Sequence, residues 1–127
     1  MKKVLVVDDD PSLLALARAF LKEEYEVVPF SNGKEALEAA VKIQPDLILT
    51  DVLMSGMSGY DFFLNLKRAD SPLRRIPVIV MSTRENLKNV FDVEAILSFL
   101  PKPFTKNELR QAVNLALGKI ENDSQQA

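Results

Sequence analysis

The residues of this sequence that are best suited to chemistry share one position: each lies within three residues after a short, mostly apolar run. They are Asp8, Asp9 and Asp10 after residues 4–7, Asp51 after 46–50, Ser82 after 78–81, and Lys102 after 96–100. The chain has no histidine and no cysteine, which excludes imidazole catalysis, thiol nucleophiles and cysteine-based zinc sites. Oxygen ligands alone suit Mg²⁺, or Mn²⁺, bound through one or two carboxylates, water and a phosphate. A metal, an ammonium and a hydroxyl around one carboxylate are typical of phosphoryl transfer to that carboxylate.

The apolar runs themselves predict the elements that position these residues. They are short, mostly β-branched and continuous, which is typical of parallel strands covered on both faces. Between them lie stretches of helical periodicity, with start signals at Asp10-Pro11, at Asn32 and at Thr105–Glu108. Five strand–helix units predict an α/β fold: a doubly wound, five-stranded parallel sheet with helices on both faces. Because the carboxyl ends of parallel strands meet at one edge, the polar residues should converge there.

Each of these residues, taken alone, also has a simpler interpretation. Asp10, next to Pro11, is better explained as a helix N-cap than as a metal ligand. Ser82 stands three residues before Glu85, so a capping box accounts for it about as well as a phosphate contact does. Lys102 alone would be an ordinary surface lysine. The convergence of four strand ends, and not any single residue, favours a site.

The length and net charge of the chain limit the number of domains and the kinds of partner that we expect. A chain of 127 residues with a net charge of −2 predicts one domain, residues 1–120, and gives no basic footprint for nucleic acid. We expect residues 121–127 to form a disordered polar tail or the start of a linker. The apolar runs are too short for a membrane span, and the start, which reaches Asp8 after four apolar residues, is unlike a signal peptide. We therefore expect a cytoplasmic location.

Five segments carry a resemblance through their order and spacing: VLVVDDD at 4–10, DLILTD at 46–51, MSG at 57–59, IPVIVMS at 76–82 and KPF at 102–104. They resemble the receiver domain of bacterial two-component response regulators of the single-domain, chemotaxis-regulator-like kind. The similarity extends from Lys3 to about Ile120. It implies the flavodoxin-like strand order 2-1-3-4-5. It also implies a signalling phosphoacceptor that catalyses only its own phosphorylation and dephosphorylation, and not an enzyme in the ordinary sense.

The resemblance implies a role for each site residue. Asp51 would accept the phosphoryl group, and the metal would be held by Asp8, Asp9, Asp51 and the backbone carbonyl of Leu53, with Asp9 as a direct ligand. Lys102 would pair with a phosphoryl oxygen and Ser82 would hydrogen-bond another. Phe99 would change rotamer as Ser82 moves, which would switch the face formed by the fourth helix, the fifth strand and the fifth helix. The Lys102–Pro103 peptide bond would be cis.

Partners follow from the same resemblance: a sensor histidine kinase or histidine phosphotransfer protein upstream, and an unknown protein downstream. We expect no direct contact with nucleic acid or membrane, and either a monomer or a phosphorylation-dependent dimer. The segment from Ser82 to Lys102 is short for this family, so we expect a shortened or displaced fourth helix, held by Leu87, Val90 and Phe91. A phosphorylation-independent interaction module on the same scaffold is the alternative. The sequence leaves open whether the chain acts alone or precedes an output domain.

Overall fold

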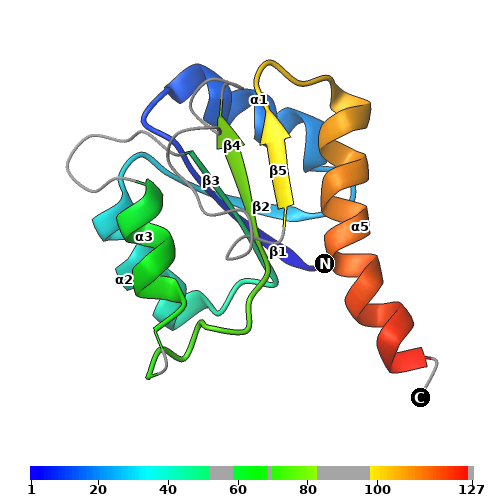
Figure 1. Ribbon diagram of the computed structural model, residues 1–127. Coiled ribbons are helices and arrows are strands. Elements are labelled where there is room, and N and C mark those ends of the chain that lie inside the picture. Colours follow the sequence, from blue (N-terminus) through cyan, green and yellow to red (C-terminus); the bar gives the residue numbers. More distant parts are fainter. Residues whose placement is uncertain (52–58, 69, 83–97, 126–127) are drawn as a thin grey trace.

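Up to residue 82, strands and helices alternate along the described part of the chain, as the apolar runs predict (Figure 1). The computed structural model describes residues 1–51, 59–68, 70–82 and 98–125. The elements are β1 (Lys3–Val7), α1 (Pro11–Leu21), β2 (Glu26–Phe30), α2 (Gly33–Ile43), β3 (Leu47–Asp51), α3 (Gly59–Leu66), β4 (Val78–Ser82), β5 (Ser98–Pro101) and α5 (Lys106–Gln125). The predicted fourth helix, with Leu87, Val90 and Phe91, lies outside the described residues.

The five strands form one parallel sheet in the order β2-β1-β3-β4-β5, which confirms the predicted topology. β3 is the central strand, with Thr50 opposite Val7 of β1 and Asp51 opposite Met81 of β4. The carboxyl ends of β1, β3, β4 and β5 therefore share one edge of the sheet. This edge carries the candidate residues.

Two apolar clusters, one on each face of the sheet, make up the core. α2 and α3 cover one face, where Ala40 and Phe62 pack against Leu5 and Ile48. α1 and α5 cover the other face, where Ala17 and Leu109 pack against side chains such as Leu49. Alternate residues of the central strands enter opposite clusters, which explains why their sequences are apolar without alternation.

The predicted helix starts are confirmed. Asp10 caps α1, because its carboxylate accepts a hydrogen bond from the backbone N–H of Ser12 at 2.9 Å. Asn32 caps α2 by accepting from Glu35 N at 2.8 Å. Before α5, Thr105 and Glu108 form a reciprocal capping box, in which each side chain accepts from the other's backbone N–H.

The cap at Asp10 gives a prediction about stability. We expect Asp10→Ala to lower the free energy of unfolding by about 1 kcal/mol, because the N–H of Ser12 loses its acceptor. Asp10→Asn keeps an acceptor at this position and is the matched control. Urea denaturation of the three proteins measures the difference. An alanine variant as stable as the asparagine variant would contradict the cap assignment.

Both edge strands carry a proline, Pro29 in β2 and Pro101 in β5. Proline has no N–H to donate to a further strand, so it is found at sheet edges. The position of Pro101 in the last strand agrees with the edge placement that the family resemblance implies. These prolines also discourage edge-to-edge pairing between copies of the chain.

Helix α5 continues to Gln125, past the predicted domain boundary at residue 120, while the disordered tail or linker start expected at 121–127 stays a prediction. No proline or glycine follows Gly118, so nothing in the local sequence stops the helix at 120. Two contacts join α5 to the turn after α1: Tyr25 OH donates to Asn114, and Arg110 pairs with Glu24.

Among the described residues, no helix is both long enough and apolar enough to cross a membrane.

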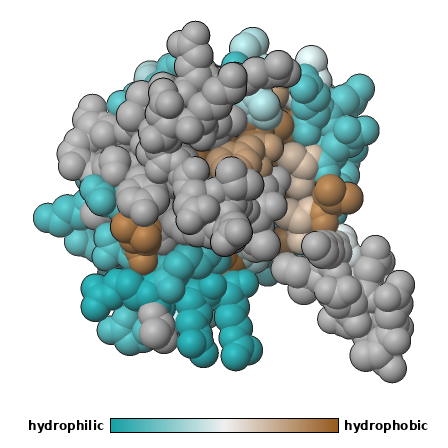
Figure 2. All heavy atoms as spheres, viewed as in Figure 1, coloured by the Kyte–Doolittle hydropathy of each residue, from teal (hydrophilic) through white to brown (hydrophobic). Residues whose placement is uncertain are grey.

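The α3–β4 connection is held by a lysine. Lys67 Nζ donates to the backbone carbonyl oxygens of Arg74 at 3.0 Å and Ile76 at 2.6 Å. The connection also places Leu73 in the core. Figure 2 shows mostly hydrophilic residues along the lower part of the view, where Figure 1 draws this connection. Burial lowers the pKa of Lys67 from its ordinary value of 10.5, since the half-buried ammonium has lost part of its hydration.

This pKa predicts how stability depends on pH. Between the lowered pKa and 10.5, the unfolded chain holds the Lys67 proton and the folded chain does not, so stability rises with pH there. We expect the free energy of unfolding of the wild type, minus that of Lys67→Met, to increase as pH rises through this window. Urea denaturation of both proteins from about pH 7 to about pH 11 measures it. A difference that stays constant would contradict the burial of a charged Lys67.

Candidate functional site

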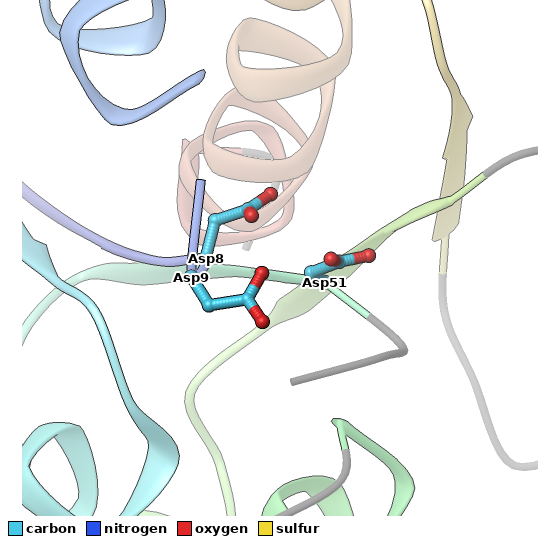
Figure 3. A group of neighbouring side chains, drawn as sticks. All are labelled: Asp8, Asp9 and Asp51. Atoms are coloured by element: carbon cyan, nitrogen blue, oxygen red, sulfur yellow. The ribbon is translucent and has the colours of Figure 1, made fainter. Parts of the chain in front are cut away.

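Four strands bring the predicted site residues to one edge of the sheet. Asp8 directly follows β1, Asp51 ends β3 and Ser82 ends β4, while Lys102 directly follows β5. One carboxylate oxygen from each of Asp8, Asp9 and Asp51 lies within 4.8 Å of the others. Figure 3 shows these three carboxylates, here called the acidic cluster, grouped at the ends of β1 and β3. The predicted convergence of these strand ends is confirmed.

Lys102 joins two members of the acidic cluster. Its Nζ lies 2.7 Å from Asp8 Oδ2 and 3.4 Å from Asp51 Oδ1. The other oxygen of Asp8, Oδ1, accepts from the backbone N–H of Asp10 at 2.9 Å. Asp8 is 1% exposed and Asp51 is 9% exposed, so this pairing takes place largely away from water. Both oxygens of Asp8 are therefore engaged by the protein itself.

The charges of this group fit a divalent cation. Three carboxylates and one ammonium have a net charge of −2 when all four are ionised. Like charges this close repel one another unless a cation lies among them. The donors are all oxygens, which Mg²⁺ and Mn²⁺ prefer. Asp9 is exposed, so a hydrated cation can approach the acidic cluster from solvent.

Ser82 adds a buried hydroxyl at the same edge. It is 1% exposed, and its Oγ has no hydrogen-bond partner in the described part of the chain. The adjacent backbone is anchored, because Lys102 N donates to Ser82 O at 2.8 Å. A buried hydroxyl without a partner is unfavourable, so such a group indicates a missing acceptor. The alternative that Ser82 caps a helix involves Glu85, which is not among the described residues.

The other predicted residues are placed as follows. Asp10 lies next to the acidic cluster, but its carboxylate caps α1, as expected. Phe99 is half-buried in β5 and packs against the core on the α2–α3 face. The Lys102–Pro103 peptide bond is cis, which confirms the prediction. The structure does not describe Leu53, so its carbonyl stays a predicted ligand.

Two features of the site are absent from the sequence predictions. The direct pairing of Lys102 with Asp8 joins residues 94 positions apart, which no local pattern reveals. Thr50, fully buried in β3, donates from Oγ1 to the backbone oxygen of Asp51 at 3.1 Å. A sequence signal for Thr50 did exist: it is a polar residue in the apolar run that leads to Asp51.

Comparison with known proteins agrees with this geometry. A family model of the response regulator receiver domain matches residues 4–114, which is most of the chain. The chain belongs to this family. The family resemblance on which the site predictions depend is thereby confirmed.

Curated relatives include proteins in which a receiver is one part of a longer chain. This receiver is 35% identical over 125 residues to the sensor histidine kinase TmoS of Ectopseudomonas mendocina, covering 96% of this chain but 13% of the kinase. It is 33% identical over 115 residues to sporulation initiation phosphotransferase F of Bacillus subtilis, covering 88% of this chain and 90% of that protein. The receiver thus spans a small part of some relatives and nearly all of another.

Solved structures show the same architecture. Chemotaxis response regulator CheY4 of Vibrio cholerae superposes with a TM-score of 0.83 at 30% identity, covering 92% of this chain and 99% of that one. A response regulator receiver domain protein from Clostridium thermocellum gives a TM-score of 0.84 at 26% identity, with 95% and 98% covered. The receiver is therefore a member of the CheY-like class in both sequence and fold.

Proposed function

We propose that this receiver is the phosphoacceptor of a two-component phosphorelay, in which Asp51 takes a phosphoryl group from a phosphohistidine. The observation that carries the proposal is the position of Asp51, with Lys102 Nζ 3.4 Å from Asp51 Oδ1 and the carboxylates of Asp8 and Asp9 within 4.8 Å. A receiver with this arrangement has a nucleophile, a positive charge and a set of metal ligands at one edge.

Asp51 supplies the reacting atom. Its carboxylate oxygen attacks phosphorus, so an O–P bond forms while the P–N bond to the donor imidazole breaks and the nitrogen keeps the electron pair. The ammonium of Lys102 lies 3.4 Å from an oxygen of the same carboxylate. It would balance the negative charge that the phosphoryl group brings. Catalysis here consists of positioning and charge stabilisation. On this view the receiver catalyses only its own phosphorylation and dephosphorylation.

The acidic cluster would hold Mg²⁺, or Mn²⁺. Asp9 would be a direct ligand, as the resemblance implies, together with Asp51, while both oxygens of Asp8 also accept hydrogen bonds from Lys102 and Asp10. Asp8 would then act by holding Lys102 in place. The family resemblance implies the backbone carbonyl of Leu53 as a further ligand of the cation. When bound, the cation supplies positive charge to the oxygens of the transferring phosphoryl group.

Ser82 and Phe99 would convert phosphorylation into a change of shape. The Ser82 hydroxyl has no partner in the described residues, so a phosphoryl oxygen on Asp51 would give it an acceptor. Phe99 lies in the adjacent strand β5, two residues before Pro101, the register partner of Ser82. Movement of Ser82 would therefore be passed to β5 and α5, which belong to the switching face that the family resemblance implies together with the fourth helix.

A histidine kinase or a phosphotransfer protein is the upstream partner we propose. The supporting observation is that relatives of this receiver include a sensor histidine kinase and a sporulation initiation phosphotransferase. The downstream partner is a protein that binds the switched face. We propose no contact with nucleic acid, since the net charge of −2 provides no basic surface in excess.

A titration followed by two-dimensional NMR tests the proposal. Mg²⁺ is added first, and beryllofluoride, a mimic of a phosphoryl group, is added second. We expect Mg²⁺ to shift the amide signals of residues 8–10 and 51. Beryllofluoride should then shift those of Ser82, Phe99 and Lys102.

Fluoride without beryllium is the control, and it should leave the second set of signals unchanged. A protein that responds to neither addition would be a phosphorylation-independent interaction module, and the proposal would be rejected. A response to Mg²⁺ alone would support the cation site but contradict the phosphoacceptor role.

A further inference from the structure

We infer that Thr50 is a positioning residue for Asp51, through a hydrogen bond that fixes the backbone from which the reacting carboxylate extends. The inference rests on the proposed function, since it concerns phosphoryl transfer to Asp51. Thr50 precedes Asp51 in the central strand β3 and is 0% exposed.

The surroundings of Thr50 do not call for a hydroxyl. Its neighbours in register are Val7 of β1 and Val80 of β4, and both belong to the apolar cluster under α2 and α3. A valine at position 50 would have almost the same shape and would match these neighbours. Burying a hydroxyl instead is unfavourable unless it is hydrogen-bonded. The hydroxyl therefore needs an explanation beyond packing.

The hydrogen bond of Thr50 supplies that explanation. Oγ1 donates to the backbone oxygen of Asp51 at 3.1 Å. The bond closes a small ring that contains the Cα of Asp51, so it restricts the φ and ψ angles of Asp51. Those angles set the direction of the Cα–Cβ bond and hence where the carboxylate lies relative to Lys102, now 3.4 Å away. Small displacements of a reacting group slow a reaction strongly.

A comparison of three substitutions tests this role. Thr50→Val keeps the shape and removes the hydroxyl, Thr50→Ser keeps the hydroxyl and removes a methyl group, and Thr50→Ala removes both. We expect the valine and alanine variants to take up phosphate from acetyl phosphate about 10-fold more slowly than the wild type, and the serine variant to stay within about 2-fold. Rates come from intact-mass spectrometry, and melting temperatures come from circular dichroism.

The melting temperatures separate positioning from packing. If Thr50 only fills space, the rate should follow stability, with serine slow because it leaves a cavity and valine fast. We expect the reverse order: serine lowers the melting temperature yet keeps the rate, while valine keeps the melting temperature and loses the rate. Should the valine variant fail to fold, serine against alanine makes the same comparison, since they differ only in the hydroxyl.

Three outcomes decide the matter. Valine and alanine slow with serine fast would support the inference. Valine as fast as the wild type, or serine as slow as alanine, would overturn it while leaving Asp51 as the acceptor. A wild-type protein that takes up no phosphate would reject the proposed function, and the inference about Thr50 with it.

Discussion

The Asp51→Asn variant should take up no phosphoryl group from acetyl phosphate under conditions in which the wild type is labelled. Asparagine keeps the size of the side chain, but its amide cannot act as the nucleophile that the carboxylate supplies. The loss should not come from unfolding. Removing one of three carboxylates within 4.8 Å of one another relieves repulsion, so we expect a melting temperature equal to or above that of the wild type.

Asp70→Asn is the matched control for this substitution. Asp70 is exposed and pairs only with the exposed Arg68 among the contacts described, so its loss should leave phosphate uptake unchanged. Intact-mass spectrometry of the three proteins measures the uptake directly. Uptake by Asp51→Asn at the wild-type rate would show that another residue is the acceptor.

Lys102→Met should slow phosphate uptake about 100-fold, because the carboxylate of Asp51 and the incoming phosphoryl group lose their nearby positive charge. The same variant should be less stable without Mg²⁺, by about 2–3 kcal/mol. The reason is that Asp8, 1% exposed, loses the ammonium that pairs with its Oδ2. Added Mg²⁺ should therefore raise the melting temperature of this variant more than that of the wild type.

Lys42→Met is the control for charge alone, since Lys42 is an exposed residue in the last turn of α2. It removes the same charge and should change neither the uptake rate nor the response to Mg²⁺. Phosphate uptake and thermal unfolding with and without Mg²⁺ make the comparison. A Lys102→Met variant that is labelled as fast as Lys42→Met would remove Lys102 from the proposed mechanism.

Much of the fold could be predicted because its determinants are local. Continuous apolar runs mark strands with both faces covered, and the caps at Asp10, Asn32 and Thr105 mark helix starts. Parallel strands place their carboxyl ends at one edge, so the acidic cluster and Lys102 could be brought together from the order of the segments alone. The strand order 2-1-3-4-5 came from the family resemblance and not from the pattern.

The parts that could not be predicted depend on contacts distant in sequence or on the absence of a stop signal. The preference of Lys102 for Asp8, at 2.7 Å against 3.4 Å for Asp51, follows from how β1, β3 and β5 meet in space. Helix α5 continues past residue 120 because residues 119–125 include no proline or glycine, although their polar composition is also typical of a tail. The role of Thr50 cannot be predicted from its run, because a threonine among apolar residues is also typical of an ordinary strand.

Locating the phosphoryl group tests the central claim most directly. The wild-type protein is incubated with acetyl phosphate, with and without Mg²⁺, and the acyl phosphate is then reduced with borohydride, which converts a phosphorylated aspartate to homoserine. Peptide mass spectrometry should find homoserine at position 51 alone, and only in the sample that contained Mg²⁺. Homoserine at a different aspartate, or equal conversion of Asp51 in the absence of a divalent cation, would contradict the account.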